Sequence, residues 1–228
     1  MAKRVIVTGA SGMIGGIVLR HCLASGEITQ VISLVRTAGT VRHPKLKEII
    51  HRDFSNYNGL ESEFTGIDIA YFCLGVYTGS VPDALFKEIT VDYTHAFAEQ
   101  LKVHSPGATF CFLSGAGADP NEQSRLAFAR YKGMAENGLI RQNFGSLTIF
   151  RPGYIYPVEK RKEPNVGYRV FRFLYPLIRL FSSNMGIKST ELGKAIFLAG
   201  LHTPGKMILE NKDILHFLDT SPVPVQPG

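Results

Sequence analysis

The chain has 228 residues, of which 45% are hydrophobic and 19% are charged, a composition typical of one globular domain and not of a disordered protein. The formal net charge is +6, but Lys and Arg are scattered, and no helix-turn-helix or RNA-binding motif accompanies them. This pattern argues against a nucleic-acid partner and leaves an anionic small molecule or a membrane surface. No uncharged apolar run reaches the roughly 18 residues of a membrane-spanning helix, and a strand beginning at residue 4 leaves no room for a signal peptide. We therefore expect a cytoplasmic protein.

Short apolar runs rich in β-branched and aromatic residues predict strands at 4–8, 31–35, 49–51, 67–74, 108–113, 147–150 and 207–209. Helical spacing of apolar residues predicts helices at 13–24, 82–103, 124–142, 167–181 and 190–201. Strands and helices alternate, and the strands are apolar on both faces. This order predicts a doubly wound Rossmann-type α/β fold, with about seven parallel strands and helices on both faces of the sheet.

No linker or internal repeat interrupts the pattern, so we expect a single domain over 1–219. Substrate-side elements are expected at about 154–190, and the proline-rich tail at 220–228 is expected to be flexible. The cysteines, Cys22, Cys73 and Cys111, are odd in number and lie apart inside apolar runs. They predict buried core thiols and neither disulfides nor a metal site.

A glycine-rich loop joins the first strand to the first helix, with the sequence Gly9-Ala10-Ser11-Gly12-Met13-Ile14-Gly15. Gly9 would allow the tight turn, Gly12 would let the backbone approach a pyrophosphate, and Gly15 would let helix and strand pack closely. The N–H groups at the start of the helix would then bind the phosphates. This loop predicts a dinucleotide site that includes Ser11, Met13 and Ile14.

The residue after the second strand is Arg36, where dinucleotide-binding proteins commonly carry an acidic residue for the ribose 2′-hydroxyl. A guanidinium there favours a 2′-phosphate, so we expect NADP(H) to be preferred over NAD(H). Asp53 and Phe54, after the third strand, are candidates for an adenine pocket, although a plain loop explains them nearly as well. Leu74 and Gly75 end the fourth strand, where a glycine would let the backbone lie against the cofactor.

In chain order, these features are followed by Leu113-Ser114-Gly115, Lys132-Gly133 and Arg151-Pro152-Gly153. With them, the chain resembles the short-chain dehydrogenase/reductase superfamily over nearly its whole length. Within that superfamily it is similar to the atypical branch of the Tat-interacting oxidoreductase-like and small nucleoside-diphosphate-sugar-epimerase-like proteins. The stretches 113–119 and 151–153 carry the greatest similarity.

The resemblance implies a catalytic Tyr four residues before a Lys that binds the nicotinamide ribose. Lys132 matches this Lys, but Phe128 occupies the usual Tyr position and has no proton to donate. Tyr131 is adjacent to Lys132 and points about 100° away around the helix, so we expect it to pack elsewhere. The resemblance also implies that Ser114, at the end of the fifth strand, polarises the substrate carbonyl; an ordinary strand-end serine is the alternative.

On the substrate side, the resemblance implies that Pro152 and Gly153 cover the nicotinamide, with Tyr154 and Tyr156 projecting nearby. One hypothesis is an NADP-dependent oxidoreductase or epimerase-like enzyme acting on a small carbonyl or quinone substrate. Ser114, Tyr77, Tyr154 or the substrate itself would then replace the missing proton donor. The other hypothesis, favoured by Phe128, is a catalytically silent NADP-sensing regulator of the NmrA type.

The segment 167–181 is apolar over most of its circumference, with a narrow basic strip. It is consistent with a buried helix, a substrate lid or a subunit contact, and less well with a helix lying on a bilayer. The sequence leaves these alternatives open, and with them the existence of a homodimer.

Overall fold

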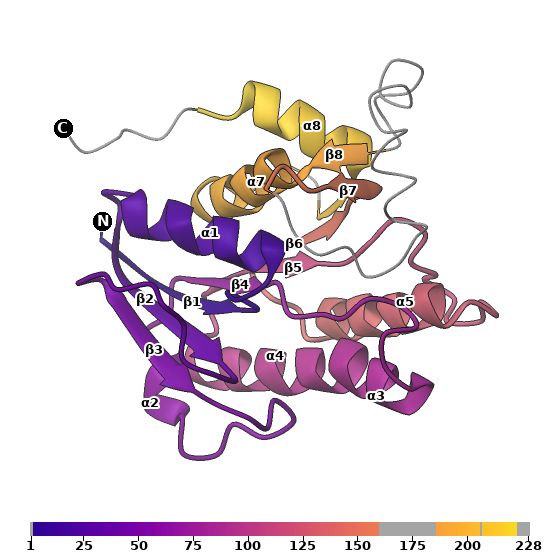
Figure 1. The fold of residues 1–228 in the computed structure, drawn as a ribbon, viewed down its shortest axis with the longest axis horizontal. Coiled ribbons are helices and arrows are strands. Elements are labelled where there is room, and N and C mark those ends of the chain that lie inside the picture. Colours follow the sequence, from indigo (N-terminus) through magenta and orange to yellow (C-terminus); the bar gives the residue numbers. More distant parts are fainter. Residues whose placement is uncertain (1, 160–185, 206, 223–228) are drawn as a thin grey trace.

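The computed structural model describes residues 2–159, 186–205 and 207–222. Its main sheet has seven parallel strands in the order β3-β2-β1-β4-β5-β6-β9 (Figure 1). The strands are β1 (Lys3–Thr8), β2 (Ile28–Val35), β3 (Leu46–Ile50), β4 (Ile69–Phe72), β5 (Thr109–Leu113), β6 (Ser146–Arg151) and β9 (Ile208–Glu210). The predicted doubly wound α/β fold is therefore confirmed, and each predicted strand overlaps an observed one.

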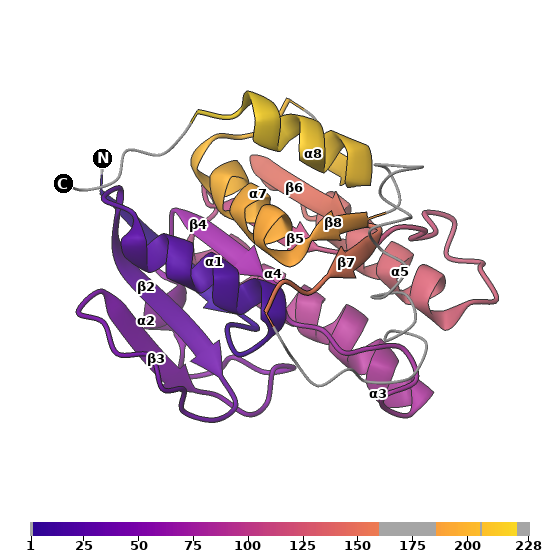
Figure 2. The ribbon, with the colours of Figure 1, turned by 45° about the horizontal axis from the view of Figure 1, so that its top comes forward.

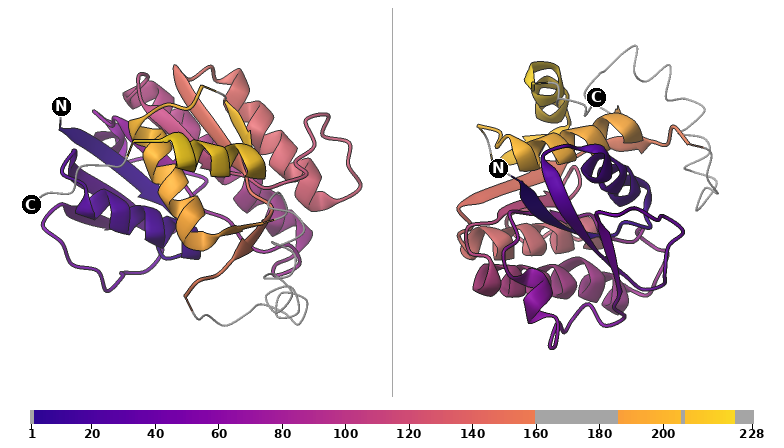
Figure 3. Two further views of the ribbon diagram at one scale, coloured as in Figure 1. Left: turned by 90° about the horizontal axis from the view of Figure 1, so that it is seen from above. Right: turned by 90° about the vertical axis from the view of Figure 1, so that its left-hand side faces the viewer.

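Helices cover both faces of the sheet, as Figures 1 and 3 show. One face carries α1 (Met13–Ala24), α7 (Ser189–Leu201) and α8 (Asn211–Thr220), and the other carries α4 (Tyr93–His104) and α5 (Ala127–Arg141). The short helices α2 (Glu61–Phe64) and α3 (Asp83–Lys87) lie on the side of α4 and α5. The chain moves outward from β1 to β3 and then returns to the other side of β1 with β4. Binding sites of such sheets lie at this reversal, beyond the carboxyl ends of the strands.

Alternation along the central strands divides the core into two layers. In β1, Val5 and Val7 join the cluster under α1 and α7, whereas Ile6 joins the cluster under α4 and α5. In β4, Tyr71 and Phe72 divide in the same way. Because both faces of each strand are buried, the sequence shows unbroken apolar runs there.

Several elements differ from the prediction. The predicted helix at 82–103 is divided into α3, a π-helical turn η1 (Glu88–Asp92) and α4. The π turn changes the buried face, so Phe86 packs with Tyr131 while Phe97 packs against the sheet. An apolar pattern read at 3.6 residues per turn does not detect a single wider turn.

The strands β7 (Tyr154–Tyr156) and β8 (Gly186–Lys188) form a separate two-stranded sheet that was not predicted, nor was α8. Figure 2 shows this small sheet beside α7. The strands of this sheet are too short to give a periodic signal. Helix α8 ends at Thr220, which is the first residue of the expected flexible tail. The predicted helix at 167–181 and most of the tail lie outside the described residues.

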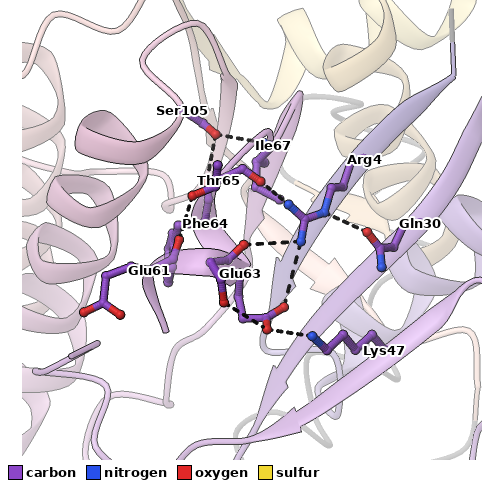
Figure 4. A network of polar contacts seen from close by, with 10 residues as sticks. Arg4, Gln30, Lys47, Glu61, Glu63, Phe64, Thr65, Ile67 and Ser105 are labelled. Carbon is purple, nitrogen blue, oxygen red and sulfur yellow. Dashed lines mark hydrogen bonds and ion pairs between the residues drawn. The ribbon is translucent and has the colours of Figure 1, made fainter. Parts of the chain in front are cut away.

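At the amino end of the sheet, Arg4 forms a polar network (Figure 4). Its Nε donates to Gln30 Oε1 at 2.7 Å, and its Nη1 donates to the carbonyl oxygen of Thr65. Its Nη2 lies 3.9 Å from Glu63 Oε2, while Lys47 Nζ lies 2.6 Å from Glu63 Oε1. The network therefore joins β1, β2, β3 and the end of α2, on the side of the sheet away from the carboxyl ends of its strands.

We predict that Arg4→Ala lowers the free energy of unfolding by about 2 kcal/mol, because it removes charged hydrogen bonds that are only partly exposed. Arg20→Ala is the control, since Arg20 makes an exposed ion pair with Glu159, and its cost should be about 0.5 kcal/mol or less. Urea unfolding followed by circular dichroism measures both. Equal losses in the two variants would contradict a structural role of the Arg4 network.

Candidate functional site

The glycine loop follows β1 and lies against the end of β4. Gly9 has a positive φ of 73°, and a Cβ placed on it would lie 2.5 Å from the carbonyl oxygen of Cys73. A Cβ on Gly15 would lie 2.2 Å from the carbonyl oxygen of Gly9. Both positions therefore require glycine, the first for its backbone conformation and the second for the close packing of α1 on the loop.

Helix α1 begins immediately after the loop, with Gly12 as its N-cap residue. No side chain caps this end, and its first turn contains no acidic residue. The partial positive charge of the helix N-terminus is thus available to an anion at the reversal of strand order.

A cavity of about 250 Å³ lies on one side of the loop. Its lining comes from the loop, the end of β2 and the residues after β4: Gly9, Ser11, Gly12, Leu34, Val35, Arg36, Phe54, Cys73, Leu74 and Gly75. Most of the residues predicted from the sequence for the adenosine half of the site are therefore brought together. Asp53 is not among them. Its Oδ1 accepts hydrogen bonds from the backbone N–H of Ser55 at 3.0 Å and from the Ser55 hydroxyl at 2.5 Å, which lower the pKa of Asp53.

Two further cavities continue from this one along the carboxyl ends of the strands. The middle cavity, of about 240 Å³, shares Gly12, Cys73, Leu74 and Gly75 with the first and adds Met13, Ile14 and Lys132. The outer cavity, of about 200 Å³, shares Met13, Tyr77, Ser114, Phe128 and Ile155 with the middle one. Because neighbouring cavities share lining residues, the three adjoin one another in a row from Arg36 to the small sheet, and we call this row the path.

The outer cavity also has Pro152, Gly153 and Tyr154 in its lining, as predicted from the sequence, together with Gly115 and Pro157. Tyr156 lies in β7 and lines none of these three cavities. Gly15 contributes through packing of the loop and not as lining.

Cys22 and Cys111 are buried free thiols, as predicted, whereas Cys73 is only partly buried because it lines the path.

Helix α5 presents Phe128 and Lys132 to the same cavity, because residues four apart lie on one helical face. The tip of the Phe128 ring would be 2.5 Å from a Cβ on Gly115, so the ring packs closely on the loop after β5. Tyr131 points away, as predicted. It is 6% exposed, and its hydroxyl donates to Asp83 Oδ2 at 2.6 Å.

Lys132 is 9% exposed, and its Nζ donates to the carbonyl oxygen of Leu113 at 3.1 Å. The ammonium also lies 5.1 Å from the centre of the Phe112 ring. Burial lowers the pKa of Lys132 to about 8, even though the negative charge of Glu136 acts in the opposite direction. The amine is therefore close to its titration midpoint at physiological pH.

Glu136, one helical turn after Lys132, was not identified from the sequence. It is 1% exposed and accepts hydrogen bonds from the Ser114 hydroxyl and from Arg151, whose Nε lies 3.1 Å from both carboxylate oxygens. Arg151 also pairs with Glu210 at 3.0 Å. A Glu in a helix is usually exposed, and the burial of Glu136 is explained by its ion pair with Arg151 on β6 and its hydrogen bond from Ser114.

We predict that the Lys132 amine titrates near pH 8, which can be measured by NMR on protein labelled at lysine ¹³Cε, with Lys132→Met to assign the signal. Glu136→Gln should move this midpoint further down, because the Glu136 carboxylate stabilises the ammonium. A midpoint near the ordinary lysine value of about 10.4 would contradict the effect of burial.

Within the described residues, every helix is too short or too polar to span a bilayer.

No protein-family model matches the chain. It is 26% identical to the protein HTATIP2 of Rattus norvegicus over 219 residues, which cover 94% of this chain and 88% of the relative. It is 25% identical to the mitochondrial protein FMP52 of Saccharomyces cerevisiae over 226 residues, covering 92% of this chain and 94% of the relative. Because this relative is named mitochondrial, the cytoplasmic location stays a prediction.

Among solved structures, the chain is similar to DesIV, a dTDP-glucose 4,6-dehydratase from Streptomyces venezuelae with NAD and TYD bound. The TM-score is 0.68 at 16% identity, and the match covers 94% of this chain and 80% of that one. This similarity concerns the fold. Together with the motifs and the two relatives, it confirms the resemblance of the chain to the short-chain dehydrogenase/reductase superfamily, and within it to the Tat-interacting oxidoreductase-like proteins.

Proposed function

We propose that the chain binds NADP(H) along this path and acts as an NADP-dependent oxidoreductase or epimerase-like enzyme on a small carbonyl or quinone substrate. The observation that carries this proposal is the row of three adjoining cavities, from Arg36 past the glycine loop to Phe128. A dinucleotide is an extended ligand with an anionic centre, and the N-terminus of α1 lies at the middle of this path.

Each part of the path has side chains suited to one part of the cofactor. The backbone of Gly12 and the N-terminus of α1 would hold the diphosphate, while Phe54 and Gly75 would border the adenosine half. Lys132 would bind the nicotinamide ribose, and Pro152 and Gly153 would border the nicotinamide. The bound cofactor would supply hydride transfer, and the protein would supply orientation and proton exchange.

The preference for NADP(H) rests on Arg36. In the cavity at the end of β2, the described lining residues include this guanidinium and neither Asp nor Glu. A ribose 2′-phosphate brings negative charge that a guanidinium can bind with two hydrogen bonds, whereas a 2′-hydroxyl is commonly bound by a carboxylate.

The lining of the outer cavity supports the proposed substrate class. Its described lining is aromatic and aliphatic apart from the hydroxyls of Ser114, Tyr77 and Tyr154, and it includes no Lys, Arg, Asp or Glu. An apolar lining with a few hydroxyl groups suits a small uncharged molecule.

The alternative function, an NADP-sensing regulator, is favoured by Phe128, which removes the usual proton donor. The outer cavity is lined by Tyr77, Tyr154 and Pro157 in addition to Pro152 and Gly153. This additional space favours an enzyme, because a protein that only senses the cofactor needs no space beyond the nicotinamide. Turnover of a carbonyl or quinone substrate with NADPH would distinguish the enzyme from the regulator. A homodimer stays a prediction in either case.

The cofactor preference can be tested by calorimetric titration with NADPH and NADH. We expect NADPH to bind more tightly, and Arg36→Ala to weaken NADPH binding by about 1 to 3 kcal/mol while leaving NADH binding nearly unchanged. Arg141→Ala is the control, because Arg141 carries the same charge on an exposed position at the end of α5. Equal affinities for the two cofactors in the wild type would contradict the NADP assignment.

The missing proton donor can be tested by Phe128→Tyr. A hydroxyl at this position would restore the Tyr and Lys pair, after a small movement of the ring tip away from Gly115, and a general acid commonly contributes 10²-fold or more. We therefore expect turnover of 9,10-phenanthrenequinone with NADPH to rise at least about tenfold. Tyr131→Phe, whose hydroxyl points to Asp83, should not change the chemical step. If the Phe128→Tyr variant binds NADPH and its turnover is unchanged, the absence of a proton donor at position 128 does not limit the rate.

A further inference from the structure

The buried carboxylate of Glu136 determines the direction of a hydrogen bond at the cavity wall. Arg151 donates to both of its oxygens, through Nε at 3.1 Å from each and through Nη2 to Oε2. A carboxylate paired in this way with a guanidinium is ionised and only accepts hydrogen bonds. In its contact with Ser114, the serine hydroxyl must therefore be the donor.

This direction leaves Ser114 with a single role toward the cavity. A hydroxyl has one proton, and that proton is directed to Glu136, so only the lone pairs of the Ser114 oxygen remain for a ligand. Ser114 lines both the middle and the outer cavities, and it is 8% exposed. The wall beside Phe128 thus offers a hydrogen-bond acceptor where the resemblance implied a donor to a carbonyl oxygen.

We propose that Glu136 holds Ser114 as an acceptor, so that the cavity binds the hydroxyl form of its substrate more tightly than the carbonyl form. This inference rests on the proposed function and concerns its reverse direction, the oxidation of the uncharged secondary alcohol that corresponds to the carbonyl substrate. The hydride of the broken C–H bond would pass to a bound oxidised nicotinamide as the C=O bond forms. The hydroxyl proton passes to the Ser114 oxygen, and the serine proton passes to Glu136. Ser114 is then the catalytic residue, and Glu136 acts through it.

The binding preference can be measured on the cofactor-free protein, because the contact between Ser114 and Glu136 belongs to the chain alone. The probes are 1-phenylethanol and acetophenone, which have the same carbon skeleton and differ in the hydroxyl or carbonyl group. Ligand-observed NMR titration should give an affinity about tenfold higher for the alcohol, the effect of one hydrogen bond. Equal affinities, or tighter binding of the ketone, would overturn the proposal.

Two variants test the origin of the preference. Ser114→Ala keeps the ion pair of Glu136 with Arg151, so it should fold and bind the two probes equally. In Glu136→Gln, the amide oxygen can stay with Arg151 while the amide nitrogen donates to Ser114. The serine proton then turns toward the cavity, and the preference should shift to acetophenone. If Glu136→Gln fails to fold, Ser114→Ala alone decides.

An alcohol preference that survives Ser114→Ala, or one that is unchanged in folded Glu136→Gln, would also overturn the proposal. The proposed function fails separately, if the wild-type protein does not bind NADPH in the calorimetric titration. A protein that binds NADPH but shows no alcohol preference would keep the proposed function and lose only this inference.

Discussion

The close approach of Gly9 to the end of β4 is the contact on which the candidate site depends. A side chain at Gly9 would collide with the carbonyl group of Cys73, and one at Gly15 would collide with that of Gly9. Without side chains, the loop passes directly from β1 into α1 at the point where the strand order reverses. The helix N-terminus and the path of cavities therefore meet at the same place, where an anionic cofactor is best bound.

Helix α5 supplies the other half of the site through residues four apart on one face. Phe128 and Lys132 reach the cavities, while Glu136 reaches Arg151 on the neighbouring strand β6. Burying two opposite charges one helical turn apart is costly unless each is hydrogen-bonded, and each is, Lys132 by a backbone carbonyl and Glu136 by a guanidinium. Burial lowers the pKa of Lys132 to about 8, so its ammonium group can lose a proton near physiological pH.

The similarity to a nucleotide-sugar dehydratase at 16% identity extends over most of the chain and describes a shared scaffold. Chemistry on such a scaffold depends on the few side chains at the carboxyl ends of the strands. Here these include Phe128 in place of a proton donor, Arg36 in place of an acid and a serine oriented by a buried carboxylate. The proposals of a small uncharged substrate and of a preference for NADP(H) rest on these departures.

The sequence by itself determined the strands of the main sheet and the helix after the glycine loop, because these depend on local periodicity and on glycine positions. Lining residues of the middle and outer cavities, such as Lys132 and Ser114, were implied by the resemblance to short-chain dehydrogenases/reductases. It did not reveal the π turn at Glu88–Asp92 or the small sheet, since each is too short to leave a period. Helix α8 was missed although Ile214, Leu215, Phe217 and Leu218 follow helical spacing. Nor did the sequence reveal Glu136. Glu136 lies in α5, and its partners Ser114 and Arg151 lie at the ends of the strands β5 and β6. Tertiary packing therefore decided that this carboxylate is buried and that the Ser114 hydroxyl donates to it.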